Sequence, residues 1–153
     1  MTNVFDLEAE YPEGNPEAFA RGRVQLSPLI GAEQLGATLY ELPPETSVCP
    51  YHYKYGREEW LVVLEGRPTV RVPDEERELE PGDVVCFPEG PAGAHKVTNR
   101  SSETVRVMLI STKQMPVVFV YPDSNKLAVG VPNPDDYLVV RRESGVGYFD
   151  GEG

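Results

Sequence analysis

The sequence predicts an all-β fold, either a sandwich or a small barrel of short strands joined by tight turns. Three observations support this prediction. The 15 prolines and 14 glycines of the 153-residue chain fall between short apolar runs, as turn residues do between strands. Several of these runs alternate apolar and polar residues, as a strand with one buried face requires. Helix signals are weak and confined to one stretch near the N-terminus.

The elements are predicted in chain order from these patterns. The first is a helical turn at 16–20, where Pro16 occupies a position that a first helical turn tolerates. Ten strands follow. They span residues 23–26, 35–42, 47–53, 60–64, 69–72, 77–79, 83–87, 96–98, 104–111 and 117–121. In the ninth strand, Val105 and Val107 lie on one face and Thr104 and Arg106 on the other.

Glycine and proline mark the connections between these strands. Residues 65–66 and 73–76 are typical of hairpin connections, and 81–83 is typical of a tight turn. After residue 121 the sequence is rich in turn signals, and one more apolar run, 137–140, precedes a tail that ends at 147–153. Such a tail could pack across the barrel, pair with a second subunit or fray.

The length is that of one domain, 1–153, with enough residues to bury a core. The composition, 40% hydrophobic and 25% charged, is typical of a soluble globular protein. No apolar run approaches the roughly 18–20 residues that span a bilayer. The first residues lack the basic and apolar regions of a secretory signal, so we expect a cytoplasmic protein.

The formal net charge is −11, from 14 basic and 25 acidic residues. A surface with this much negative charge repels phosphate backbones and anionic lipid headgroups, which argues against nucleic-acid and membrane partners. The two cysteines, Cys49 and Cys86, are expected to be separate packing thiols in a reducing cytosol. Regular strand alternation would place Cys49 on the face opposite to His52.

The chain has only two histidines, and both stand in segments with metal-ligand character. Strand alternation places His52 and Lys54 on one face. A bend at Gly56 would return the chain so that Glu59 can reach His52, and His95 would enter the same cavity from a second hairpin. Imidazole and carboxylate suit borderline divalent metals, and two histidines with one carboxylate can hold one face of a metal ion.

The spacing of these residues resembles the two sequence motifs of the cupin superfamily. The first motif has two histidines, a glutamate and a glycine, and His52, Lys54, Glu59 and Gly66 fill these places. Lys54 therefore stands where the family has its second histidine. The glycine that opens the motif is absent, because Thr46 occupies its position.

The second motif is matched by five residues, with four residues instead of two before the histidine. These residues are Gly82, Pro88, Gly90, His95 and Asn99. The two motifs and their strands cover about residues 35–112, the length of one cupin barrel. The resemblance implies a cupin double-stranded β-helix, or jelly-roll barrel, with a metal near its middle. Carried over residue by residue, it implies His52, Glu59 and His95 as metal ligands.

Lys54 leaves three outcomes open. The side chain swings aside from a metal held by two histidines and a carboxylate. It loses its proton beside the metal and acts as a general base. Or its charge replaces the metal and pairs with Glu59 or Glu58. Glu58 itself is expected to face away from the cavity.

Two main functions are compatible with these residues. The first is a cupin whose cavity binds a divalent transition metal (Fe, Mn, Ni or Zn), with the enzymatic conversion of a small organic or sugar-like molecule as one interpretation and Lys54 as the catalytic residue. The second is a metal-free small-ligand-binding or structural cupin in which Lys54 pairs with Glu59. A pure interaction module is a third hypothesis. The resemblance and the C-terminal segment also predict a homodimer, and whether the protein is an enzyme stays open.

Overall fold

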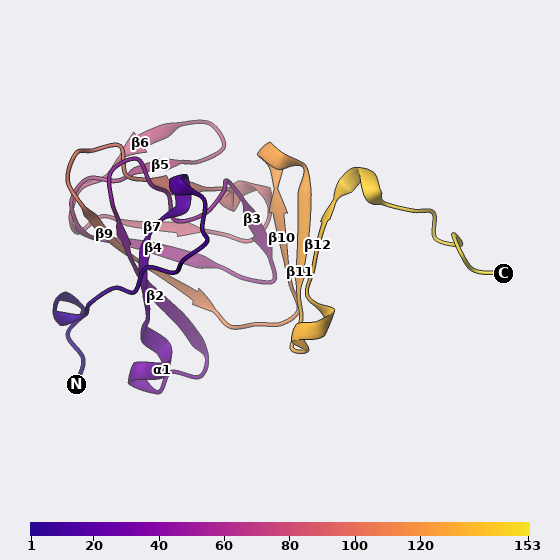
Figure 1. The fold of residues 1–153 in the computed structure, drawn as a ribbon, viewed down its shortest axis with the longest axis horizontal. Coiled ribbons are helices and arrows are strands. Elements are labelled where there is room, and N and C mark those ends of the chain that lie inside the picture. Colours follow the sequence, from indigo (N-terminus) through magenta and orange to yellow (C-terminus); the bar gives the residue numbers. More distant parts are fainter.

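Three antiparallel sheets make up the structure, a computed structural model that describes residues 1–153 (Figure 1). The five-stranded sheet has the order β1-β2-β9-β4-β7. Its strands are β1 (Gly22–Gln25), β2 (Leu35–Leu42), β4 (Glu59–Glu65), β7 (Val84–Phe87) and β9 (Val105–Thr112). The two longest strands, β2 and β9, pair along their full lengths, from Leu35 opposite Thr112 to Leu42 opposite Val105. The all-β prediction is confirmed.

The other two sheets are smaller. A three-stranded sheet has the order β6-β5-β8, and a four-stranded sheet has the order β12-β11-β10-β3. Their strands are β3 (Tyr53–Tyr55), β5 (Thr69–Arg71), β6 (Glu76–Glu78), β8 (Lys96–Thr98), β10 (Val117–Tyr121), β11 (Lys126–Gly130) and β12 (Leu138–Arg141). β10 pairs with both β3 and β11, and therefore attaches the C-terminal hairpin to the strand that carries Lys54.

Helical structure is limited to short pieces. The single α-helix, α1 (Leu26–Ile30), ends at Gly31, which adopts the left-handed conformation (φ 70°) that terminates helices. Six 3₁₀ turns complete the structure: η1 (Val4–Asp6), η2 (Glu17–Phe19), η3 (Pro91–Gly93), η4 (Pro122–Ser124), η5 (Pro134–Asp136) and η6 (Arg142–Ser144). No helix is both long and apolar enough to cross a membrane.

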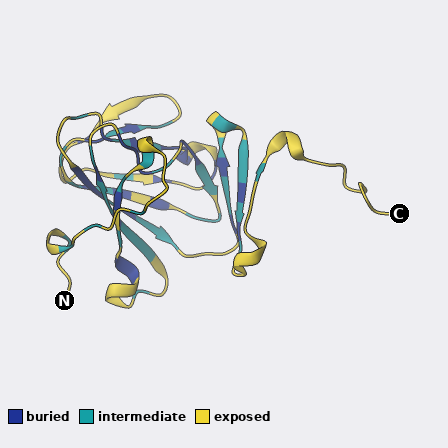
Figure 2. Cartoon of the chain, in the orientation of Figure 1, coloured by how far each residue is buried: buried dark blue, intermediate teal, exposed yellow.

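The core lies between the sheets and is built from alternate residues of the central strands (Figure 2). In β4, for example, Glu59, Leu61 and Val63 are buried, whereas Trp60 is exposed. The apolar core residues are Leu42, Val48, Leu61, Val63, Val70, Leu79, Phe87, Val97, Val105, Val107 and Leu109. Glu59 thus stands at the end of an apolar row, which places a carboxylate at the edge of the core.

Nine of the ten predicted strands are confirmed to within one residue at each end, and the prediction for residues 47–53 is wrong. Residues 47–53 are not a strand, because Ser47 and His52 make only isolated bridges, and the chain between them bends around Pro50, which lacks a donor for sheet pairing. The helix α1 begins where the first strand was expected to continue. The strand β11 was not predicted, because its neighbouring turn residues concealed a short apolar run. The predicted helical turn corresponds to η2.

The C-terminal tail leads away from the barrel (Figure 1). Residues beyond Arg141 are exposed, and they include the large apolar side chains of Val146, Tyr148 and Phe149. Of the three arrangements considered for the tail, packing across the barrel is therefore wrong for this chain.

Candidate metal centre

The two histidines are brought together by backbone pairing. The amide of His52 donates to the carbonyl of His95 (3.1 Å), and the amide of His95 donates to the carbonyl of His52 (2.9 Å). This isolated antiparallel bridge joins the turn before β3 to the turn before β8. Directly opposed residues project to the same face, and the two ring centroids lie 4.7 Å apart.

Glu59 reaches the histidines from the five-stranded sheet. It is the first residue of β4, and it lies opposite Phe87 of β7 and Ser111 of β9. The Phe87 ring also stacks on the His95 ring, with 3.6 Å between centroids and 8° between planes. The sheet thereby orients both the carboxylate and one imidazole.

Three side chains form a buried cluster of electron-pair donors. His52, Glu59 and His95 are 4%, 7% and 2% exposed, respectively. Each offers one ligand atom, and the three atoms lie within 4.8 Å of one another. The structure therefore brings together the three residues that the sequence predicted as metal ligands.

Backbone carbonyls fix the orientation of both imidazoles. His52 Nδ1 lies 3.0 Å from the carbonyl oxygen of Pro50, and His95 Nδ1 lies 2.8 Å from that of Gly93. A carbonyl oxygen only accepts, so each Nδ1 carries a proton, and Nε2 is the ring nitrogen left to bind a metal. Metal-binding histidines are commonly held in this way.

The two oxygens of Glu59 face different partners. Oε1 accepts from the Lys54 ammonium at 2.7 Å, and Oε2 lies 3.3 Å from His95 Nε2. Neither of these two buried atoms has a hydrogen-bond partner of good geometry. A nitrogen that faces an anionic oxygen at this distance is unfavourable unless a proton or a metal cation lies between the two atoms. The donor set therefore fits a divalent metal, even though Lys54 occupies the other oxygen.

The surroundings also set the protonation state that a metal requires. Burial raises the pKa of Glu59, but its contacts with His95 and Lys54 outweigh burial and lower the pKa to about 2. Burial, assisted by the nearby His95 and Lys54, lowers the pKa of His52 to about 3. At neutral pH the centre thus presents an anionic carboxylate and a neutral His52.

Acid is expected to destabilise the metal-free protein through His52. The unfolded chain takes up a proton on this residue near pH 6.5, whereas the folded chain resists it down to about pH 3. Stability is therefore full above about pH 6.5 and falls as the pH is lowered through this window, by about 1 kcal/mol per pH unit. Denaturant unfolding of chelator-treated protein at several pH values checks this. The His52→Gln variant should show a shallower pH dependence than the wild type, and equal slopes would contradict it.

The cluster opens into a cavity of about 170 Å³, which we call the inner lobe. Lys54 and His52 both line it, as predicted from their shared strand face, whereas His95, which was expected to enter the same cavity, is buried behind its lining. The other lining residues are Tyr40, Val48, Cys49, Glu59, Leu109, Phe119 and Tyr121. The ammonium of Lys54 lies 5.6 Å from the centre of the Phe119 ring. Glu58 is exposed and accepts from the Trp60 indole (2.9 Å), so it faces away from the cavity, as expected.

Sequence reasoning misplaced one cavity residue and missed several others, among them two aromatic residues. Cys49 does not face away from His52, because its sulfur lies 3.4 Å from His52 Nδ1. The bend around Pro50 breaks the strand alternation on which the prediction rested. Phe119 and Tyr121 were missed. Their alternation in β10 signals a common face, but only the pairing of β10 with β3 directs that face to the metal centre.

Comparisons with known proteins agree with the fold. Residues 38–111 match the family model of the cupin domain, Cupin_2. A sugar phosphate isomerase of the cupin superfamily from Silicibacter pomeroyi is similar in structure (TM-score 0.82, 20% identity), and the similarity covers 98% of each chain. A protein from Acidithiobacillus ferrooxidans that is proposed to be a sugar phosphate isomerase has a TM-score of 0.81 at 25% identity and covers 94% of this chain and 91% of its own.

More distant likenesses cover less of the chain. The polyketide cyclase RemF from Streptomyces resistomycificus has a TM-score of 0.60 at 27% identity, covering 76% of this chain and 83% of its own. No curated protein sequence matches the chain.

Proposed function

Because the chain belongs to the cupin superfamily, we propose that it is a metal-dependent enzyme that isomerises a small sugar-like molecule. Membership in the superfamily fits the predicted jelly-roll barrel. One observation carries the metal-dependent part of the proposal. Glu59 divides its oxygens between Lys54 and the unpaired Nε2 of His95, so one carboxylate can serve a cation and the lysine at the same time.

The metal would be held by His52 Nε2, His95 Nε2 and Glu59 Oε2. This mixed nitrogen and oxygen set suits iron, manganese, nickel or zinc. A bound metal supplies Lewis-acid polarisation of a substrate oxygen, and three protein ligands leave room for that oxygen.

Lys54 is the residue that we assign to substrate chemistry. It is 12% exposed and is held against Glu59 Oε1 at one side of the inner lobe. As an ammonium, its Nζ can donate a hydrogen bond to a substrate hydroxyl or carbonyl. After losing that proton to solvent, the free amine can take a proton from one substrate carbon and return it to the neighbouring carbon. Phe119 and Tyr121 form part of the wall of the same cavity.

The substrate class is inferred from the compared proteins. Two structures whose similarity covers nearly all of this chain are described as a sugar phosphate isomerase and a proposed one. Isomerisation of such a sugar moves a proton between neighbouring carbons while a carbonyl oxygen is stabilised. The inner lobe has residues for both parts of this proposal, since Lys54 would exchange the proton and the donor cluster fits a metal.

A second candidate function is metal-free binding of a small ligand. The 2.7 Å ion pair between Lys54 and Glu59 favours it, because the pair already neutralises the buried carboxylate. The two functions predict different metal contents when the ammonium group of Lys54 is removed.

The Lys54→Met variant tests the proposal against this rival. Tag-free wild type and variant are incubated with iron, manganese, nickel and zinc, dialysed and submitted to elemental analysis. We expect about one metal ion per chain in both, since removal of a nearby cation only strengthens metal binding. An absence of metal from both proteins, or its presence in the variant alone, would support the metal-free function.

The isomerase assignment has a separate test in the same pair of proteins. The proteins are incubated with a sugar phosphate in heavy water. If Lys54 transfers the proton, deuterium from the solvent should appear on the carbon next to the substrate carbonyl, and NMR measures the rate of this exchange. We expect exchange with the wild type and at least about 100-fold slower exchange with Lys54→Met. Equal exchange rates in the wild type and the variant would show that Lys54 does not transfer the proton.

A further inference from the structure

A second, more polar cavity of about 280 Å³, which we call the outer lobe, adjoins the cavity at the metal centre. The two lobes share Tyr40, Glu59 and Leu109, so Glu59 lies at their boundary. The remaining residues of the outer lobe come from β1, α1, β2, the turn before β4 and the end of β9: Gln25, Ser27, Pro28, Gly36, Ala37, Thr38, Arg57, Ser111 and Lys113. Only three of its twelve lining residues are hydrophobic, which suits a polar ligand.

Two cations of the outer lobe are held by uncharged groups. Arg57 Nε donates to the carbonyl of Gln114 (2.9 Å), and Lys113 Nζ donates to the carbonyl of Ala32 (2.7 Å). Burial lowers the pKa of Arg57, whereas the charge of Glu59 raises it, so this guanidinium is partly removed from water near the metal-centre carboxylate. Both cations are positioned by the backbone and keep further N–H groups for a ligand.

The charge of the combined cavity is positive, although the chain as a whole carries −11. Lys54, Arg57 and Lys113 supply three cations, and Glu59 is the only carboxylate among the lining residues. The charges of Lys54 and Glu59 neutralise each other in their ion pair, so the remaining positive charge lies at the outer lobe. The hydroxyls of Ser111 and Thr38 line the same space. Such a set of donors suits an anionic group with several oxygens, as in a phosphate.

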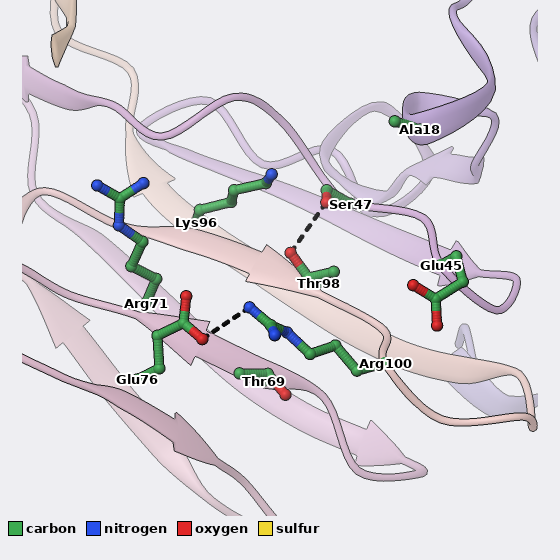
Figure 3. A pocket seen from close by; sticks show the side chains of 9 residues that line it. All are labelled: Ala18, Glu45, Ser47, Thr69, Arg71, Glu76, Lys96, Thr98 and Arg100. Carbon is green, nitrogen blue, oxygen red and sulfur yellow. Dashed lines mark hydrogen bonds and ion pairs between the residues drawn. The ribbon is translucent and has the colours of Figure 1, made fainter. Parts of the chain in front are cut away.

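A different basic pocket lies on the outer face of β5 and β8 (Figure 3). Its two arginines already bind carboxylates. Arg100 contacts Glu76 at 2.7 Å, and Arg71 contacts both oxygens of Asp123 at 2.6 and 3.1 Å. The third cation of this pocket, Lys96, is balanced by Glu45, so the pocket has little free positive charge, and it shares no lining residue with the cavity at the metal centre. The outer lobe is therefore the better anion site.

We propose that Arg57 and Lys113 bind the phosphate group of a phosphorylated small molecule whose opposite end reaches the metal centre. The position of that opposite end rests on the proposed function, but the phosphate site does not. The volumes of the two lobes, about 170 and 280 Å³, accommodate a small polyhydroxy chain between them.

Calorimetric titration of metal-free protein tests the site. The ligands are inorganic phosphate and glycerol 1-phosphate, and glycerol is the control ligand that lacks a phosphate. We expect the wild type to bind both phosphates and not glycerol. Arg57→Gln and Lys113→Gln should each weaken phosphate binding at least about tenfold. Arg100→Gln, in the pocket of Figure 3, is the matched control and should bind as the wild type does.

Three results would overturn the phosphate site: no binding by the wild type, unchanged binding by both outer-lobe variants, or a loss of binding in Arg100→Gln alone. Chelator-treated protein is used throughout, so a failure of metal binding does not affect this test. Conversely, a protein that binds stoichiometric metal but no phosphate would support the metal centre and would contradict only the phosphate-binding role of Arg57 and Lys113.

Discussion

Replacement of both histidines by alanine is expected to abolish metal binding and to leave the barrel folded. His52 and His95 provide two of the three donor atoms, and they are the only histidines in the chain. Loss of one ligand should weaken metal binding at least about 100-fold, because even the loss of an outer hydrogen-bond partner costs 10–100-fold. The double variant should therefore retain no metal through dialysis. Elemental analysis of tag-free protein measures the effect.

The carboxylate offers a matched pair of variants for the same experiment. Glu59→Gln and Glu58→Gln remove one negative charge each, at neighbouring positions on opposite faces of the chain. Glu59 is 7% exposed in the donor cluster, whereas Glu58 is exposed and bonded to Trp60. We expect metal loss in the first variant and wild-type metal content in the second. Retention of metal in both the double-histidine and Glu59→Gln variants would place the metal elsewhere.

Gly93→Ala is expected to destabilise the fold and to displace His95. A Cβ at this position would lie 1.7 Å from the carbonyl oxygen of Pro88 and 2.8 Å from its carbonyl carbon. Both atoms belong to the backbone, so no side-chain rotation relieves the contact. We expect a loss of at least about 3 kcal/mol in the free energy of unfolding. The carbonyl of Gly93 also accepts from His95 Nδ1, so the imidazole should move with it.

Denaturant unfolding and metal titration of Gly93→Ala measure the two effects together. Gly147→Ala serves as the control, because no heavy atom lies within 4 Å of its added Cβ and its φ is not positive. The control should match the wild type in stability and metal affinity. A Gly93→Ala protein with wild-type stability would mean that the turn before His95 is looser than the structure shows.

The metal-ligand motif was accessible to sequence reasoning because its residues lie on short, regular segments. His52 and Lys54 are two residues apart, so their shared face follows from alternation alone. Glu59 continues the apolar row of Leu61 and Val63, which marks it as a buried carboxylate. The glycine- and proline-rich turn before His95 indicated a second hairpin. The spacing of these residues then predicted the cupin barrel, and the family match and the sheets agree with it.

Local patterns failed where the chain departs from regular structure. The bend at Pro50 moves Cys49 to within 3.4 Å of His52 Nδ1, although strand alternation places them on opposite faces. The strand β11 was concealed by the turns that flank it. At Pro50 the missing backbone donor broke the expected strand. For β11, pairing with β10 and β12 decided the conformation, and a short window of sequence contains no information on that pairing.

The sequence by itself determined the strand-rich architecture, the candidate ligands and the presence of Lys54 among them, because these depend on residue type and on spacing within one strand. Only the tertiary structure decided how Glu59 divides its two oxygens, and that the lysine and the donor cluster can coexist. It also decided that Arg57 and Lys113 share a lobe next to Glu59. These relations join segments far apart in the chain, and their distances depend on how the strands pair and pack.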